Sequence, residues 1–411
     1  MKKLYIFSFL LILSVSNLFS QSGWYQIMYQ GGSSFHTFGL VDTNIVMIPS
    51  SSYVFYRSTN GGINWTESIT PPGSAVTGIH FINSLTGFTC ALNGQIRKTT
   101  NAGGSWITTE YCINCSFYDI QFTDSVTGYI CGTSGRIIKT TNAGVNWFNL
   151  SSNVTGSLDA LNFINNLTGF AAGSPGGNGV IIKTTNGGSN WVLSFSGTSE
   201  YYTDIIFTSP DTGYCVGLNN QILKTTNSGS NWFNQFTLSQ AIFYSVSFIN
   251  NQTGYAAGSS GKIYRTSNGG INWLQQQSPY NELFGCIKFI NQNTGYVTSY
   301  WYGYMFKTTN GGLTWINPES NIITQSFSLH QNYPNPFNPV TKINFDILNQ
   351  SNAIIIIYDL LGREITTLVN EQLKPGSYSV DWDGTGFASG VYFYSLVTDE
   401  FFETKRMVLV K

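Results

Sequence analysis

Lys183-Thr184-Thr185-Asn186-Gly187-Gly188-Ser189-Asn190-Trp191 is one copy of a motif that recurs along most of this 411-residue chain. The copies end at Trp65, Trp106, Trp147, Trp191, Trp232, Trp273 and Trp315. Successive copies are 41 to 44 residues apart, and Trp24 stands 41 residues before the first of these tryptophans. A period of this size indicates a repeated supersecondary unit.

Each repeat contains four strand-like runs separated by turn residues. In one copy these runs are residues 120–122, 129–131, 136–139 and 147–150. The first run carries a phenylalanine at a matching position in six repeats: Phe81, Phe122, Phe163, Phe207, Phe248 and Phe289. Apolar residues never show the 3.6-residue spacing of a helix. Four antiparallel strands with this period are typical of a propeller blade, so we predict an all-β, seven-bladed β-propeller over residues 21–318.

The two ends of the repeat array predict how the ring closes. The seventh repeat ends shortly after Trp315, which leaves its fourth strand short or absent. Residues 24–27 match the strand that follows the motif in the other repeats. We therefore predict that this N-terminal segment completes the last blade and leaves no open sheet edge.

The first residues and the charge balance restrict where the protein works. Lys2 and Lys3 precede an apolar run at residues 4–15, and Ser20 fits a cleavage site, so residues 1–20 are predicted to be a secretory signal peptide. We expect no membrane-spanning segment after its removal, because the run is short and no second span follows. A formal net charge of -1 gives no electrostatic reason to expect nucleic acid as a partner.

Two of the cysteines are predicted to be buried core residues, and two others form a local pair. Cys90 and Cys131 occupy equivalent positions in neighbouring repeats, where other repeats carry small apolar residues, so we expect them to be buried. Cys112 and Cys115 form a CxxC pair in a loop. No βαβ pattern or second pair accompanies them, which favours a local disulfide or two inert thiols over a redox or metal site.

The recurring motif has the form Ser/Thr-x-Asn-x-Gly-x-x-Trp. It resembles the Asp-box of bacterial neuraminidase repeats. The longer pattern, from Phe-Ile-Asn-x-x-Thr-Gly-Tyr to Lys-Thr-Thr-Asn-Gly-Gly-x-x-Trp, resembles the propeller family of photosystem II assembly factors. This resemblance implies the fold and a general scaffold role. Asparagine replaces the aspartate of the box, so a turn built on the amide is expected and a cation site that needs the carboxylate is not.

The pattern changes after Pro318. Residues 319–326 are predicted to be a linker, and the short alternating strands of residues 327–411 predict a small immunoglobulin-like β-sandwich. Residues 331–339, 358–363 and 405–411 resemble the type A C-terminal sorting domain of the type IX secretion system. The resemblance implies that the secretion machinery recognises this domain and that the protein is secreted or attached to the outer cell surface.

Candidate catalytic residues are few. His36, His80 and His330 lie apart from acidic or cysteine clusters in the sequence, so we expect no metal site, no Ser-His-Asp site and no cofactor. The arginines of the repeats do not assemble the arginine triad of a neuraminidase. Glycoside hydrolysis needs two carboxyl groups, and the spacing of the candidate carboxylates along the sequence does not single out a pair. The carboxylates considered are Asp119, Asp159, Asp204 and Glu200.

A basic residue also recurs once per repeat. The column consists of Arg57, Lys98, Lys139, Lys183, Lys224, Arg265 and Lys307. It predicts either an anion-binding ring or side chains that lie along the neighbouring blade with their charged ends in water. We favour the second interpretation.

The loops on the face away from the motif differ between repeats and are rich in aromatic residues. Variable aromatic loops on a rigid ring are typical of a recognition surface. We expect Tyr118, Tyr202, Tyr244 and Trp301 to contact a ligand. The sequence thus predicts a non-catalytic binding or scaffold propeller for an extracellular glycan or protein. The alternatives are a glycoside-active hydrolase with a carboxylate pair on the propeller face, and a structural component of the cell surface.

Overall fold

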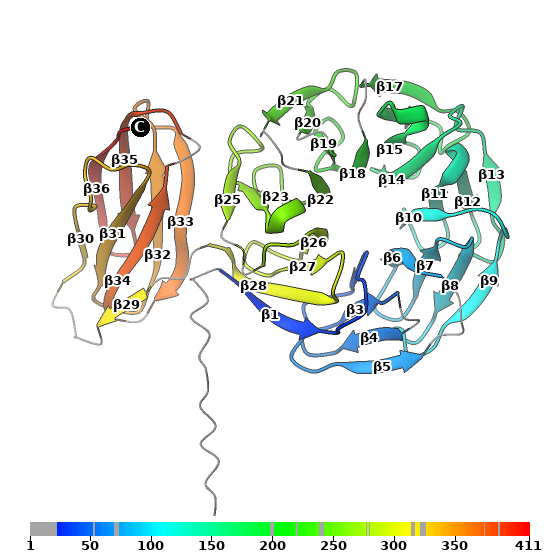
Figure 1. Ribbon diagram of the computed structural model, residues 1–411, viewed down its shortest axis with the longest axis horizontal. Coiled ribbons are helices and arrows are strands. Elements are labelled where there is room, and N and C mark those ends of the chain that lie inside the picture. The colour runs from blue at the N-terminus through cyan, green and yellow to red at the C-terminus, as the bar shows by residue number, and fades with distance from the viewer. Residues whose placement is uncertain are drawn as a thin grey trace, which may run out of the picture.

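The computed structural model shows an all-β chain, as the sequence predicted. It describes residues 23–51, 54–69, 74–197, 201–218, 221–237, 242–276, 278, 280–313, 317–320, 326–373, 375–384 and 387–411. The predicted signal peptide, Glu200 and Trp315 lie outside these residues. Within them, seven antiparallel four-stranded sheets form the blades of a ring, and a sandwich lies beside the rim (Figure 1).

The blades follow one another along the chain, each with its first strand nearest the axis (Figure 1). The first three blades are β2 (Gly39–Leu40), β3 (Val46–Pro49), β4 (Val54–Ser58) and β5 (Thr66–Ile69); β6 (Val76–Phe81), β7 (Gly87–Ala91), β8 (Gln95–Thr99) and β9 (Ile107–Glu110); and β10 (Phe117–Phe122), β11 (Gly128–Gly132), β12 (Ile137–Thr140) and β13 (Phe148–Leu150). Blades 4 to 6 are β14 (Ser157–Phe163), β15 (Gly169–Ser174), β16 (Val180–Thr184) and β17 (Val192–Ser196); β18 (Tyr202–Phe207), β19 (Gly213–Gly217), β20 (Gln221–Thr225) and β21 (Phe233–Thr237); and β22 (Phe243–Phe248), β23 (Gly254–Gly258), β24 (Ile263–Thr266) and β25 (Leu274–Gln276).

Blade 7 joins the two ends of the propeller. It consists of β26 (Phe284–Phe289), β27 (Gly295–Ser299), β28 (Tyr304–Gly312) and the N-terminal strand β1 (Gly23–Tyr29), which pairs antiparallel with β28. The predicted ring closure is therefore confirmed. The Trp24 ring meets Phe289 edge-on at a centroid distance of 5.7 Å, so it packs as the tryptophans of other repeats do against their own phenylalanines.

Aromatic rings fasten each blade to the next. Tyr129 of blade 3 stacks on Phe163 of blade 4 with centroids 3.7 Å apart, and Trp191 meets Phe163 edge-on at 5.8 Å. The same stack and edge contact recur in the following blades. Stacked and edge-to-face rings are the two favoured arrangements of aromatic pairs. The repeated Phe and Trp positions therefore encode the interface between blades.

The motif closes the turn between the third and fourth strands through its asparagine. Asn186 Oδ1 accepts a hydrogen bond from the Asn190 backbone N–H at 2.9 Å, and Thr184 Oγ1 accepts one from the Gly188 N–H at 3.0 Å. Gly187 and Gly188 have φ values of 67° and 85°, a region that glycine adopts without strain. The amide oxygen thus supports the turn without a carboxylate, as the sequence predicted.

The basic column also joins neighbouring blades. Lys139 Nζ lies over the Tyr129 ring and donates a hydrogen bond to the Gly187 carbonyl of the next motif at 2.9 Å. Equivalent bonds to the next motif are made by Arg57, Lys98, Lys183, Lys224 and Lys307. For these six side chains the favoured interpretation is correct about their direction and wrong about their charged ends, which bind backbone carbonyls. Arg265 differs, because its Nε donates to the Tyr255 hydroxyl at 3.2 Å.

Replacing Lys139 with methionine keeps the apolar stem and removes the ammonium group. We expect the free energy of unfolding, measured by urea denaturation, to fall by about 1.5 kcal/mol, because a hydrogen bond to a charged donor is lost. Lys262→Met is the control, since the Lys262 side chain makes no hydrogen bond or ion pair with any residue that the structure describes. Equal losses in the two variants would show that Lys139 does not join the blades.

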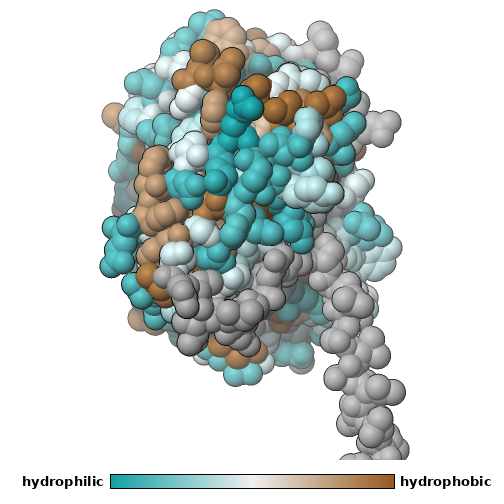
Figure 2. Space-filling view, turned by 90° about the vertical axis from the view of Figure 1, so that its left-hand side faces the viewer, coloured by the Kyte–Doolittle hydropathy of each residue, from teal (hydrophilic) through white to brown (hydrophobic). Residues whose placement is uncertain are grey.

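The C-terminal part folds as a sandwich of two antiparallel sheets. One sheet has the order β29 (Asn317–Ser320), β34 (Gly376–Asp383), β31 (Val340–Ile347), β30 (Ser328–Leu329), and the other has the order β33 (Glu364–Leu373), β32 (Ser351–Tyr358), β35 (Gly390–Val397), β36 (Phe402–Leu409). Alternate residues of β31 and β32, such as Phe345 and Ile355, are buried in the core between the sheets. The outer side of this domain is hydrophilic with separate hydrophobic patches (Figure 2).

Strand β29 lies where the sequence placed the end of the propeller and the start of a linker. Its backbone pairs with β34 through Asn317 opposite Ser379 and Ser320 opposite Ser377. Residues 317–320 therefore add an edge strand to the sandwich. Hydrogen bonding to a strand more than 50 residues later is a long-range event, which no local pattern in residues 317–320 reveals.

The cysteines follow the expected division. Cys90 and Cys131 are buried in the cores between blades, as predicted. Cys112 and Cys115 form a disulfide within their loop, which is one of the two favoured interpretations.

Candidate functional site

One residue in each blade forms a ring near the axis, on the face away from the motif. In six blades it is the residue at the β-bulge between the first two strands. In blade 1 it is His36, which precedes β2. A bulge re-aims the side chain next to it. This axial ring consists of His36, Thr77, Tyr118, Asp159, Thr203, Tyr244 and Gly285, all partly exposed.

Tyr300 takes the place of the missing side chain at Gly285. A Cβ atom on Gly285 would lie 3.1 Å from the Tyr300 ring, which comes from the loop between β27 and β28. The Tyr300 ring lies 4.4 Å from the ring of His36 and 5.9 Å from that of Tyr244. Burial, and then the neighbouring phenols of Tyr244 and Tyr118, raise the pKa of Tyr300. Blades 1, 3, 6 and 7 thus bring four aromatic rings together near the axis.

Asp159 is the acidic member of the axial ring. Burial raises the pKa of its carboxyl group to about 6. Among the residues that the structure describes, no side chain or backbone group hydrogen-bonds to this carboxylate, and no basic group contributes to its pKa. The hydroxyls of Thr77 and Thr203, in contrast, donate to the carbonyls of Phe117 and Phe243. Asp159 is therefore a charged group of the axial ring that forms no hydrogen bond or ion pair with the residues that the structure describes.

The four residues predicted to contact a ligand lie in different environments in the structure. Tyr118 and Tyr244 lie in the axial ring, and the Trp301 ring packs edge-on against Tyr300 at 4.7 Å with 51% of its residue surface exposed. Tyr202 is only 2% exposed and belongs to a core cluster between blades, so it cannot contact a ligand. The repeat spacing carries a signal for this correction, because Tyr202 falls in the column of Phe117 and Phe243.

A second group of tyrosines lies beside Trp301, and the sequence did not single out two of its members, Tyr29 and Tyr304. Tyr29 of the ring-closing strand β1 stacks on Tyr304 at 4.5 Å, and Tyr280 lies 4.7 Å from Tyr304. Tyr29 and Tyr302 are 55% and 56% exposed. Because β1 comes from the far end of the propeller, only its pairing with β28 brings Tyr29 to this surface. Together with Trp301, these residues form an aromatic rim on blade 7.

The loop that presents Trp301 is held by backbone and side-chain bonds. The Tyr300 backbone N–H donates to the Leu283 carbonyl at 2.8 Å. The buried Ser299 hydroxyl donates to the Trp301 carbonyl and accepts a bond from the Tyr304 N–H at 2.9 Å. A loop fixed at both ends loses little conformational entropy when a ligand binds.

Two of the carboxylates considered for catalysis have structural roles. Asp119 accepts hydrogen bonds from the backbone N–H groups of Ile120 and Leu161, and thereby links blades 3 and 4. Asp204 does the same for Ile205 and Val246, which links blades 5 and 6. Burial raises the pKa of Asp119, and it raises that of Asp204 to about 7. The backbone bonds occupy both groups, so of the three considered carboxylates that the structure describes, Asp159 is the one without such bonds.

The sandwich contains a histidine–aspartate contact that the sequence did not predict. His330 Nε2 lies 2.7 Å from Asp346 Oδ2 and 3.0 Å from Ser328 Oγ. A Ser-His-Asp triad needs one imidazole nitrogen for each partner, whereas here the same nitrogen meets both. The cluster therefore fastens β30 to β31. Among the described residues, no group of three or more His, Cys, Asp or Glu side chains is arranged to hold a metal ion.

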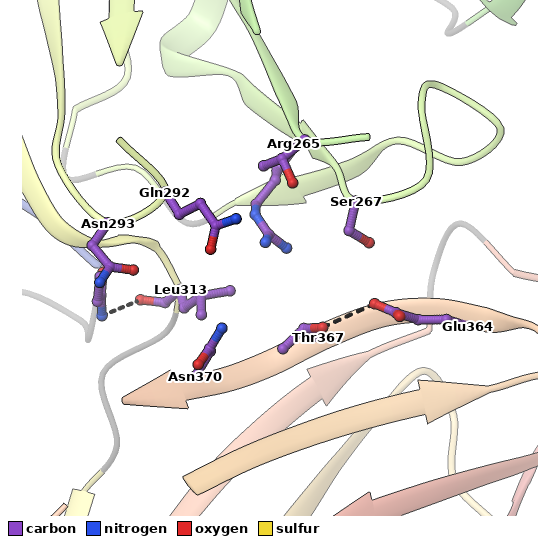
Figure 3. Close-up of a pocket in the computed structure, with 10 residues that line it drawn as sticks. Arg265, Ser267, Gln292, Asn293, Leu313, Glu364, Thr367 and Asn370 are labelled. Atoms are coloured by element: carbon purple, nitrogen blue, oxygen red, sulfur yellow. Dashed lines mark hydrogen bonds between the residues drawn. The ribbon is translucent and has the colours of Figure 1, made fainter. Parts of the chain in front are cut away.

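A small polar pocket lies between the propeller and the sandwich. Its volume is about 160 Å³, and its walls include Arg265, Gln292 and Asn293 of the propeller and Glu364 and Asn370 of β33 (Figure 3). Thr367 Oγ1 donates to Glu364 Oε1 at 2.9 Å on the sandwich side. The pocket lies on the motif side of blades 6 and 7, away from the axial ring.

Comparisons with known families agree with both parts of the fold. Residues 96–197 and 193–316 match the family described as photosynthesis system II assembly factor YCF48, and these matches span more than half of the chain. Residues 331–411 match the family described as secretion system C-terminal sorting domain. No curated protein matches the sequence.

Two solved structures share the propeller fold. One, described as YCF48 bound to D1 peptide, is 17% identical, covers 71% of this chain and 96% of its own, and has a TM-score of 0.59. The other, YCF48 from Cyanidioschyzon merolae, is 17% identical, covers 69% of this chain and 98% of its own, and has a TM-score of 0.58. At this identity the likeness concerns the fold alone. A search of the described residues for a helix with the length and hydropathy of a membrane span found none.

Proposed function

The chain belongs to the family of YCF48 photosystem II assembly factor propellers, and we propose that it is a non-catalytic binding or scaffold protein that works outside the cell. Its C-terminal sorting domain directs export by type IX secretion to the cell surface or the extracellular space. A photosystem partner does not transfer with the fold, because function resides in the site and not in the architecture.

The observation that carries the proposal is the aromatic rim on blade 7. Trp301 and Tyr302 project from a braced loop, and Tyr300 connects this loop to the axial ring. Exposed aromatic rings on a rigid support supply contact area at a small cost in conformational entropy. The ordered backbone bonds of Asp119 and Asp204 support a binding role over a hydrolytic one.

Of the two ligand classes predicted from the sequence, a polypeptide is the one we propose. One solved YCF48 structure is described as bound to a peptide, which supports this class for a propeller of the same family. The surface also combines partly exposed hydroxyls and a carboxylate with apolar rings, which suits the mixed chemistry of a peptide.

The test is a ligand search with the full chain against peptide and glycan arrays, followed by affinity measurements on the best ligand. We expect Trp301→Ala to weaken binding by about 30-fold, the effect of losing a central aromatic anchor. Phe233→Ala removes another exposed aromatic side chain, from the outer strand β21, and should leave the affinity unchanged. Ligand binding that is unchanged in Trp301→Ala would contradict the proposal, and so would hydrolysis of a polysaccharide.

A further inference from the structure

The axial ring combines a carboxylate that has no partner among the described residues with several aromatic side chains, and this combination suits a positive charge. Asp159 lies on β14, close enough to Tyr118 of β10 for its charge to raise the pKa of that phenol, after the larger effect of burial. Tyr118 in turn acts on the pKa of Tyr300. An aromatic face attracts a cation through its quadrupole, and a desolvated carboxylate attracts it through its charge.

Among the residues that the structure describes, no basic group acts on Asp159. The strands that pack against β14 near Asp159 carry Tyr118 and Asp119 on β10, Cys131 on β11 and Asp204 on β18, and none of these groups is basic. Lys288 of β26 donates a hydrogen bond to the Phe38 carbonyl at 2.7 Å, and its charge acts on Asp119. A carboxylate that is mostly buried without a counter-charge costs stability, which is typical of a group reserved for a ligand.

We propose that the axial ring binds the side chain of a lysine or arginine residue from a polypeptide ligand, with Asp159 as the counter-ion and Tyr118, Tyr244 and Tyr300 as the aromatic wall. This inference rests on the proposed binding function and names the chemistry of its ligand. A long basic side chain can reach the axis while the ligand backbone stays on the surface beside Trp301. A neutral or acidic side chain would leave Asp159 uncompensated.

The experiment uses the full chain and a matched pair of probes. The peptides are acetyl-Gly-Ser-Arg-Ser-Gly-amide and the same peptide with citrulline, a neutral isostere, in place of arginine. We expect calorimetric titration at low salt to show about tenfold tighter binding of the arginyl peptide, since tenfold corresponds to one modest charge interaction. Asp159→Asn should abolish the difference between the peptides. Glu110→Gln removes an equal charge from the exposed outer strand β9 and should preserve it.

The pH dependence provides a second readout. The pKa of Asp159 is about 6, so the free carboxylate is mostly charged at neutral pH and neutral below that value. The affinity for the arginyl peptide should therefore fall as the pH is lowered through 6 in the wild type, and Asp159→Asn should remove this dependence. Other described groups remain in this variant: the pKa of Asp204 is about 7, burial raises the pKa of Asp119, and burial lowers the pKa of His36 in the axial ring. A pH dependence that persists in Asp159→Asn would overturn the inference.

Asp159→Asn is expected to fold, so a loss of peptide binding in this variant would not be caused by unfolding. Asparagine has nearly the same shape and no charge to bury, so Asp159→Asn should unfold at the same or a higher urea concentration. Equal binding of the two peptides to the wild type would reject the basic side chain as the ligand. Tighter binding of glucosamine than of the arginyl peptide would also reject it. In either case, an array ligand whose affinity falls in Trp301→Ala would still support the proposed binding function. Only the assignment of a basic side chain to the axial ring would then be rejected.

Discussion

Trp24→Ala is expected to lower the free energy of unfolding by about 4 kcal/mol, the usual cost of removing a large aromatic side chain from a core. Trp24 is 2% exposed and packs with Tyr255, Phe284 and Phe289 at the junction of blades 6 and 7. Its indole N–H also donates to Gln276 Oε1 at 3.3 Å. Because β1 joins the two ends of the propeller, losing its anchor also weakens ring closure.

Urea denaturation followed by circular dichroism measures this effect without relying on tryptophan fluorescence. Trp301→Ala is the matched control, because it deletes the same side chain at a position that is 51% exposed. We expect the control to change the free energy of unfolding by less than about 0.5 kcal/mol. A similar small change in Trp24→Ala would show that the N-terminal strand does not hold the last blade.

Deleting residues 317–411 is expected to prevent export across the outer membrane. The matched sorting family covers residues 331–411, and β29 extends the same sandwich back to Asn317. We therefore propose the domain boundary at Asn317, with a cleaved signal at residues 1–20 and the propeller between them. A deletion that starts at residue 327 would leave β29 without its partner strand β34, as an unpaired segment open to aggregation.

The measurement is the distribution of the truncated chain between periplasm, cell surface and medium. The truncated protein should accumulate in the periplasm as a protease-resistant propeller, which shows that a folding failure does not cause its retention. Trp382→Ala provides a second variant, because this 2% exposed side chain packs against Phe337 and Tyr392 in the sandwich core. We expect it to reduce export as well. Normal surface amounts of the truncated chain would disprove the sorting role.

Much of the fold follows from sequence because its signals are periodic. The spacing of the motif determines the number of blades, and the repeated phenylalanine and tryptophan columns determine how blades pack. The match between residues 24–27 and the strand after each motif correctly predicted ring closure. The cell-surface destination likewise follows from motifs that lie in continuous stretches of the sandwich.

The candidate site was only partly predictable. Tyr118, Tyr244 and Trp301 were singled out because aromatic loops differ between repeats, yet the same reasoning also selected the buried Tyr202. One residue of register separates Tyr202 from the axial ring, and a bulge decides which side chain turns toward the axis. The role of Tyr300 depends on the absence of a side chain at Gly285.

The repeat, the ring, its closure and the sorting domain could all be predicted from the amino-acid sequence, because each depends on spacing or on contiguous motifs. The assembled blades reveal that Asp159 has no counter-charge among the described residues, while Asp119 and Asp204 bind backbone groups of the next blade. All three are aspartates on the first strands of blades, and Asp159 stands one register position before the column of Asp119 and Asp204. Their difference arises from which backbone N–H groups and rings come into reach when the blades close around the axis, and that proximity is set by the assembled ring.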